Sequence, residues 1–366
     1  MRAMSRRRFL KKTAVGAVVA AGALARPAIA QTKKVVLGLP WLPTGQYTFP
    51  FVAREIGAWS KRGLDVEVVR GAGSLAALQN LVAGRFDIAI LGTPPTLVGI
   101  QRGQPLRVLG TVGYEHTLAL ALPADSPINE PAQLVGHSIG QVPAAGDTPL
   151  LPIFLERNHV DPSKVEIIAL EAKVLEQALI SRQVDAIPIY AVSSLPNFVS
   201  RKFAVRQWPY SSVGLKFYLT QIVAKPDFVD ANRLLVADMI DGLFEGIKYT
   251  LLEPEHSIDL HIKANPELAV LDMSREFINV GQSIIQVSIY SEQSRQHGLG
   301  YSVPDELAWQ AKILRETSLK DLPGQPPKPD HYLTNEFVGK VTLTPVQWDE
   351  VHGRVSRYAD LVGLKV

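Results

Sequence analysis

The sequence of 366 residues contains no cysteine, which excludes disulfides and thiolate chemistry. It also has few consecutive apolar residues: the run at 13–25 is about 13 residues long, whereas a membrane-spanning helix needs about 20. Hydrophobic residues make up 46% and charged residues 20%, values that exclude a disordered chain and a multi-span membrane protein. The length indicates two or three domains.

Excess charge of one sign is also missing from most of the chain. The formal net charge is +3, but residues 1–30 hold seven basic side chains and no acidic one. The remaining residues carry 31 basic against 35 acidic side chains, a net charge of −4. This slightly acidic body lacks the positive surface that phosphate backbones require, so we predict no nucleic-acid partner.

The basic head has the three parts of a bacterial export signal. A charged start precedes the apolar run 13–25, and a small-residue cleavage site follows at 28–30 (AIA). Residues 5–11 (SRRRFLK) match the twin-arginine export pattern. We interpret 1–30 as a twin-arginine signal peptide and expect a periplasmic protein with no membrane insertion after cleavage. The alternative, an uncleaved anchor, conflicts with the short apolar run.

Motifs for catalysis and cofactor binding are absent as well. The eight histidines are scattered without an H-E-x-x-H spacing, and no serine lies in a G-x-S-x-G elbow. Residues 71–76 (GAGSLA) resemble a dinucleotide fingerprint, but the next strand has no acid at its carboxyl end to hold a ribose. We therefore predict no catalytic residue, no metal site and no cofactor.

The pattern that is present alternates strands with helices. Strands are expected at 35–39, 64–69, 86–91, 106–110, 117–122, 138–140, 165–168, 186–189 and 218–224, with helices such as 75–83 among them. Such alternation predicts an α/β fold with a parallel sheet. Later segments are mostly helical, at 231–252, 266–270, 273–280 and 304–314. The proline-rich stretch 321–329 is expected to be an extended connector.

A weak internal repeat lies within this pattern. Residues 79–88 (QNLVAGRFDI) parallel 177–186 (QALISRQVDA) at an offset of 98 residues. Both read as a helix, a tight turn and an Asp that leads into a buried strand. Duplication of one unit and convergence on the same local solution are both compatible with the pattern.

Polar and aromatic residues gather at the carboxyl ends of the expected strands, where open α/β sheets bind ligands. Each one alone can be a helix cap or a turn residue. Together they predict a ligand cleft. They are Trp41, Thr44, Gln46 and Tyr47 after the first strand, Gly92 and Thr93 after the third, Gly146, Asp147 and Thr148 before a helix, and Tyr190 and Ser193 after the strand at 186–189.

Four segments resemble the SsuA/THI5-like (NMT1) periplasmic substrate-binding proteins of ABC transporters: 40–47 (PWLPTGQY), 53–59 (AREIGAW), 62–68 (RGLDVEV) and 78–89 (LQNLVAGRFDIA). The resemblance covers about residues 35–317. It implies a type II periplasmic-binding-protein fold, with two α/β lobes joined by two crossing strands and a ligand cleft between them. Lobe one would comprise 31–125 and 217–366, and lobe two 126–216, with one copy of the repeat in each.

The resemblance further implies a non-enzymatic receptor that captures a small organic molecule and delivers it to an ABC permease. Members of the family carry alkanesulfonates, taurine, nitrate, pyrimidine precursors of thiamine, riboflavin or aromatic acids. Transferred by position, the family's contacts fall on Trp41, Gln46, Tyr47, Thr93, Gly146, Asp147, Thr148 and Tyr190. A periplasmic enzyme on the same bilobed frame and a ligand-loaded partner of a sensor ectodomain are the alternatives.

Asp147 departs from the pattern of the oxyanion-binding members. An acid at a helix start occupies the free N–H groups and repels a second negative charge. Whether Asp147 caps that helix or faces the cleft stays open at this point. Because hydrogen bonds alone contribute little net binding, packing on Trp41, Tyr47 and Tyr190 should be substantial. We therefore expect a planar, nitrogen-bearing or aromatic ligand rather than an inorganic anion.

Overall fold

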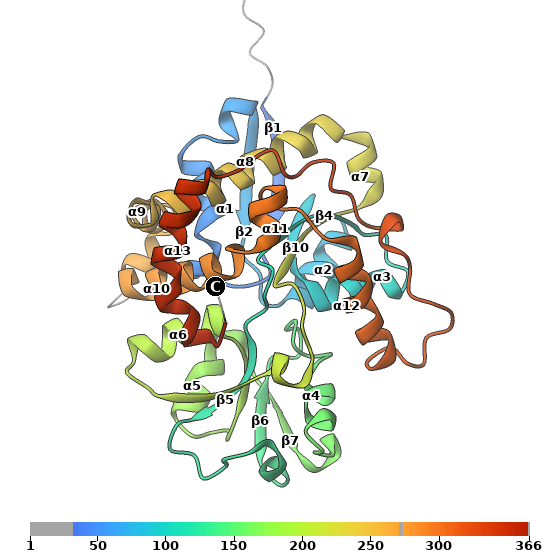
Figure 1. Ribbon diagram of the computed structural model, residues 1–366, viewed down its shortest axis with the longest axis vertical. Coiled ribbons are helices and arrows are strands. Elements are labelled where there is room, and N and C mark those ends of the chain that lie inside the picture. Colours follow the sequence, from blue (N-terminus) through green and yellow to red (C-terminus); the bar gives the residue numbers. More distant parts are fainter. Residues whose placement is uncertain (1–31, 271–273, 365–366) are drawn as a thin grey trace, which may run out of the picture. The chain divides into compact units, whose positions relative to one another are not determined.

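The first strand set is a five-stranded sheet in the order β2-β1-β3-β10-β4. The computed structural model describes residues 32–270 and 274–364 (Figure 1). Strand β1 runs parallel to β2 and β3, whereas β10 runs antiparallel to β3 and β4. Every residue of β3 is buried, as its continuous apolar sequence requires. The bounds are β1 Lys33–Gly38, β2 Leu64–Val69, β3 Ile88–Gly92, β4 Arg107–Val112 and β10 Thr220–Ala224.

The second strand set repeats this order. Strand β5 lies between β8 and β9 and is antiparallel to both, while β6 and β7 form a parallel pair. A single bridge between Ile139 and Ala186 links β6 to β8, which gives β7-β6-β8-β5-β9. The bounds are β5 Leu118–Pro123, β6 Ser138–Gln141, β7 Glu166–Ala169, β8 Ile187–Tyr190 and β9 Val205–Pro209.

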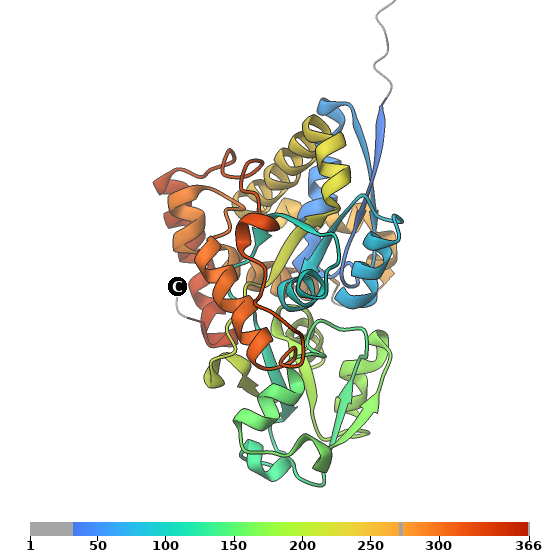
Figure 2. The same ribbon diagram turned by 90° about the vertical axis from the view of Figure 1, so that its right-hand side faces the viewer.

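Helices cover both strand sets and dominate the later part of the chain, drawn in yellow to red in Figures 1 and 2. Helix α8 packs on α1, and α10 contacts α6 of the second strand set. The bounds are α1 Thr48–Glu55, α2 Ser74–Val82, α3 Thr93–Gln101, α4 Leu151–Arg157, α5 Leu175–Ile180, α6 Ala191–Ser200, α7 Pro226–Ala231, α8 Arg233–Leu252, α9 Pro254–Ala264, α10 Ser274–Ile289, α11 Glu292–His297, α12 Pro304–Glu316 and α13 Pro345–Ala359.

Two segments carry the chain between the strand sets. Residues 113–117 lead from β4 to β5, and residues 214–219 lead back to β10. They are hydrogen-bonded to each other: the N–H of Leu219 donates to the carbonyl of Gly113, and that of His116 to the carbonyl of Phe217, both at 3.0 Å. The two crossings therefore lie side by side.

The expectation of a parallel sheet is wrong for two strands. Strands that precede a covering helix, such as β1 and β3, end at the same edge of their set. Strands β5 and β10 instead enter their sets from that edge, directly after a crossing segment, and so run in the opposite direction. The division into lobes at 31–125 with 217–366, and at 126–216, stays a prediction.

Most expected elements are confirmed within a few residues, but some are not. The helix expected at 266–270 is a 3-10 helix, and several elements lie outside the expected segments, among them β9, α9, α11 and α13. The proline-rich stretch between α12 and α13 has no helix or strand before Pro329, as expected for a connector. The signal peptide predicted for 1–30 lies outside the described residues. Within the residues that the structure describes, no helix has the length and apolar character to span a membrane.

Candidate functional site

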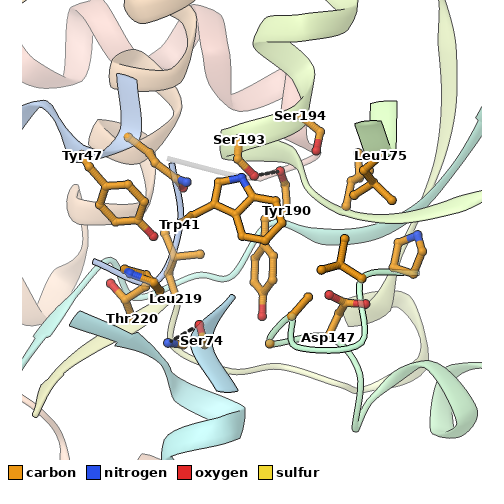
Figure 3. Close-up of a pocket in the computed structure, with 18 residues that line it drawn as sticks. Trp41, Tyr47, Ser74, Asp147, Leu175, Tyr190, Ser193, Ser194, Leu219 and Thr220 are labelled. Carbon is orange, nitrogen blue, oxygen red and sulfur yellow. Dashed lines mark hydrogen bonds between the residues drawn. The ribbon is translucent and has the colours of Figure 1, made fainter. Parts of the chain in front are cut away.

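A pocket with a cavity volume of about 50 Å³ lies where the ends of the two strand sets meet (Figure 3). Equivalent places in the two sets supply its walls. These are the loops after β1 and β6, the ends of β3 and β8, and the starts of α2 and α5. The lining residues are Pro40, Trp41, Gln46, Tyr47, Ser74, Gly92, Val142, Ala145, Gly146, Asp147, Leu175, Pro188, Ile189, Tyr190, Ser193, Ser194, Leu219 and Thr220.

The loop after β1 presents Trp41, Gln46 and Tyr47 to the pocket. The loop is held in place from behind, because the Nε2–H of buried His261 donates to the carbonyl of Pro43 at 3.0 Å. Burial lowers the pKa of His261 to about 4, so the ring stays neutral at ordinary pH. Only glycine fits at position 45, because the Cβ of any other residue would overlap the backbone of α10.

Asp147 lies on the opposite wall, after β6, and only 5% of it is exposed. Its Oδ2 accepts a hydrogen bond of 3.1 Å from Nε2 of Gln141. Burial raises the pKa of Asp147 to about 6, and the bond from Gln141 opposes that rise. Helix α4 begins at Leu151 and has no side-chain cap. Asp147 is therefore a wall residue of the pocket and not the cap of this helix.

Tyr190, at the end of β8, points its hydroxyl toward the part of the pocket where Ser74 and Asp147 lie (Figure 3). Its hydroxyl is shielded from solvent and has no hydrogen-bond partner among the described residues. Burial raises the pKa of Tyr190, and the charge of Asp147 adds to the rise. The hydroxyl thus stays protonated and is free to bond to a ligand.

Eight of the eleven residues predicted to form the cleft line this pocket: Trp41, Gln46, Tyr47, Gly92, Gly146, Asp147, Tyr190 and Ser193. Thr44, Thr93 and Thr148 do not. The hydroxyl of Thr148 donates to the carbonyls of Val142 and Pro143 instead. Thr93 is fully buried at the start of α3, and Thr44 is buried just before the short helix Gly45–Tyr47. The ligand contacts themselves stay predictions.

Sequence reasoning missed several lining residues, above all Ser74, Leu175, Leu219 and Thr220. Ser74 follows the glycine-rich turn that was considered only as a dinucleotide motif, and its Oγ accepts a hydrogen bond from Gly92 N at 3.0 Å. Leu219 and Thr220 line the pocket because β10 starts at that edge. A signal for them would have been the opposite direction of β10, which the pattern of strands and helices does not encode.

Charge is sparse around the pocket and has one sign. Among the described residues that line it, Asp147 alone has an ionisable carboxyl, and no Lys, Arg or His is present. A second carboxyl lies directly behind the wall, where Glu176 accepts a hydrogen bond of 2.7 Å from the hydroxyl of Ser194. Across residues 32–270 and 274–364, no three His, Asp or Glu side chains form a group that could hold a metal ion.

The fold defines the class of protein. The alkanesulfonate-binding protein SsuA of Xanthomonas axonopodis pv. citri, solved bound to MOPS, superposes with a TM-score of 0.64 at 14% identity, covering 83% of this chain and 99% of that one. The chain therefore has the periplasmic-binding-protein fold that the sequence predicted. The NMT1/THI5-like family model matches residues 44–257, and the chain belongs to the NMT1/THI5-like family.

Two curated relatives are named for what they bind. The formylaminopyrimidine-binding protein of Halalkalibacterium halodurans is 24% identical over 149 residues, which are 41% of this chain and 45% of that protein. The riboflavin-binding protein RibY of Chloroflexus aurantiacus is 20% identical over 314 residues, 84% of this chain and 86% of that protein. The match thus spans less than half the length of the first relative.

Proposed function

We propose that this chain is a periplasmic solute receptor that captures a small, planar, nitrogen-bearing organic molecule and delivers it to an ABC importer. Membership of the NMT1/THI5-like family and the fold support the receptor role. The names of the relatives, one binding a formylaminopyrimidine and one riboflavin, support a planar heterocyclic ligand. Export by the twin-arginine route, predicted from residues 5–11, would place the receptor in the periplasm.

One observation carries the proposal: three aromatic side chains from both strand sets, Trp41, Tyr47 and Tyr190, line one pocket. Micromolar binding requires about 8 kcal/mol. Buried hydrogen bonds contribute only about 1 kcal/mol net each, so packing on these rings must supply much of the rest. In this proposal the two predicted lobes close on the ligand, which stabilises the closed form only through contacts that the open form lacks.

The test starts with the natural ligand. Native mass spectrometry of protein released gently from its own periplasm should detect a small molecule that leaves unchanged when the protein is denatured. Binding of that molecule is then measured for Trp41→Ala and Tyr190→Ala, which should each weaken it by at least about tenfold. Trp309→Ala is the matched control, because Trp309 is 45% exposed on α12 and does not line the pocket. Unchanged affinity in both pocket variants, or chemical conversion of the molecule, would refute the receptor.

A further inference from the structure

We propose, building on the receptor function above, that the pocket selects an organic cation: a planar group whose positively charged N–H donors bond to Asp147, while oxyanions are excluded. Asp147 would act as the counter-ion of the ligand, and the hydroxyl of Tyr190 would accept or donate a further bond beside it. The charge of the carboxylate, its free bonding capacity and the state of the surrounding N–H groups support the proposal independently.

Charge around the pocket favours a cation. The carboxyl of Asp147 is almost fully buried and lines the pocket, and the carboxyl of Glu176 lies behind Ser194 on the same wall. Within the described lining, no cationic side chain balances the charge of Asp147. Arg201, whose charge acts on Glu176, is directed to the side-chain oxygen of Gln177. An anion entering this pocket would meet uncompensated negative charge at low dielectric, which is costly.

The bonding capacity of Asp147 also favours an N–H donor. A carboxylate has about four acceptor positions. Gln141 supplies a side-chain hydrogen bond to Asp147, and this bond reaches Oδ2 only. A buried carboxylate with spare acceptor capacity is unfavourable until a donor arrives, so an N–H-bearing cation would recover part of the desolvation cost. The aromatic rings of Trp41 and Tyr47 on the facing wall also attract cations to their faces.

The helix starts around the pocket offer few donors to an anion. Free N–H groups at a helix start are the usual binding site for an oxyanion. At the start of α3, Pro94 and Pro95 have no N–H to offer, and the N–H of Thr93 donates to the carbonyl of Leu219. The prolines thus remove the donors that an anion would need at this end of the pocket.

At two further helix starts, those of α2 and α6, some N–H groups are already in use. On α2, the N–H of Leu75 donates at 3.1 Å to the carbonyl of Ala144, which belongs to the second strand set. On α6, the N–H groups of Ala191 and Val192 donate to the carbonyl and hydroxyl oxygens of Thr117, at 2.8 and 3.2 Å. The pocket therefore combines a buried acid with helix starts at which several donors are missing or already in use.

The experiment uses three probes of nearly the same shape and different charge: benzamidinium (positive), benzamide (neutral) and benzoate (negative). Their binding to the mature chain is measured by calorimetry at neutral pH, with thermal shift as a second readout. Benzamidinium should bind at least about tenfold more tightly than benzamide, and benzoate should not bind, since an unpaired buried charge separates the three. Tighter binding of benzoate or benzamide than of benzamidinium would overturn the cation proposal.

Two matched variants assign the selection to a residue. Asp147→Asn keeps the shape and the acceptor for Gln141, and should reduce the preference for benzamidinium over benzamide to near one. Glu176→Gln also removes a carboxyl, but one that does not line the pocket, and should retain most of the preference. Loss of the preference in Glu176→Gln but not in Asp147→Asn would contradict the role of Asp147. Thermal unfolding checks that both variants fold.

The outcomes also separate this inference from the receptor function. If benzoate or benzamide binds best and its binding is lost in Trp41→Ala, the receptor function stands and only cation selection fails. If none of the three probes binds at millimolar concentration and the native protein releases no small molecule, both proposals fail.

Discussion

Asp87 and Asp185, which lie 98 residues apart, make the same hydrogen bond in the two strand sets. Asp87, just before β3, accepts from the backbone N–H of Val36 in β1 at 2.8 Å. Asp185, just before β8, accepts from the N–H of Ser138 in β6 at 2.9 Å. The strand orders β2-β1-β3-β10-β4 and β7-β6-β8-β5-β9 correspond position by position. This agreement extends well beyond the repeat seen in the sequence and favours duplication over convergence.

The two sets differ in the loops that come after equivalent strands. After β1 the chain supplies Trp41, Gln46 and Tyr47, whereas after the equivalent β6 it supplies Gly146 and Asp147. The shared scaffold thus places two loops against one pocket, and the loops differ in chemistry: one is aromatic, the other acidic. A ligand that needs both an aromatic and an acidic partner is recognised only where the two strand sets meet.

Replacing Asp147, the pocket acid of the second strand set, should have the largest effect on the free energy of unfolding. Burial raises the pKa of Asp147 from 3.8 to about 6. Because the folded pKa lies above the unfolded one, the contribution of Asp147 to stability is most favourable below about pH 4 and is lost as the pH rises through about 6. We expect Asp147→Asn to stabilise the ligand-free protein by up to about 3 kcal/mol at pH 7.5, two pKa units being worth about that much.

Urea unfolding at pH 4 and pH 7.5 measures this effect, and the low-pH pair of curves is the internal control. At pH 4 the wild-type carboxyl is mostly protonated, so the variant and the wild type should differ little. A stabilisation that is equal at both pH values would show that the charge of Asp147 is not its cause.

The equivalent Asp residues provide the next test. Asp87→Ala and Asp185→Ala should each cost about 1–2 kcal/mol, because each leaves a strand N–H without its partner. The two losses should add in the double variant, since the residues belong to different strand sets. Urea unfolding measures them, with Asp65→Ala on the exposed face of β2 as a control that should change little. A loss confined to one Asp would break the equivalence.

The turns that precede Asp87 and Asp185 differ in their residues. Substitutions in these turns should have the smallest effect on the free energy of unfolding. Gly84 has a φ of +74°, and Arg182 has a φ of +60° at the matching place. A side chain costs about 1 kcal/mol there, so Gly84→Ala should destabilise by that amount. Arg182→Gly relieves the same strain but also loses the ion pair with Asp125, whose Oδ1 lies 2.7 Å from Nη2 of Arg182. The two changes should nearly cancel.

The effects of the ion pair and of the backbone strain at Arg182 can be measured separately. In an Asp125→Ala background, where the ion pair is already gone, Arg182→Gly should stabilise by about 1 kcal/mol. Thermal unfolding of the single and double variants completes the cycle. If Arg182→Gly is equally neutral in both backgrounds, the left-handed turn of the second set carries no strain and the comparison with Gly84 fails.

Sequence reasoning worked where the local pattern determines the outcome. Strands β1, β2 and β3 alternate or run apolar over their length, and the residues that come after β1, β6 and β8 reach the pocket because such ends meet at one edge. Prediction from the sequence failed where contacts between distant segments determine the structure. Strand β9 is half-buried along its length and has no alternation. The direction of β10 depends on the crossing, so Leu219 and Thr220 were missed.

The orientation of Asp147 shows the same limit. Local rules allowed either a helix cap or a wall residue. The structure resolves the choice through Gln141, which lies on β6 and reaches Oδ2 across the loop. No spacing rule links an amide on a strand to an acid six residues later.

The paired crossing segments have a mechanical consequence. Residues 113–117 and 214–219 are bonded to each other at two points, so neither can change direction without pulling on its neighbour. The two segments therefore form one paired band. Leu219 belongs to this band and also lines the pocket. An occupant of the pocket would therefore contact one of the two segments that join the strand sets.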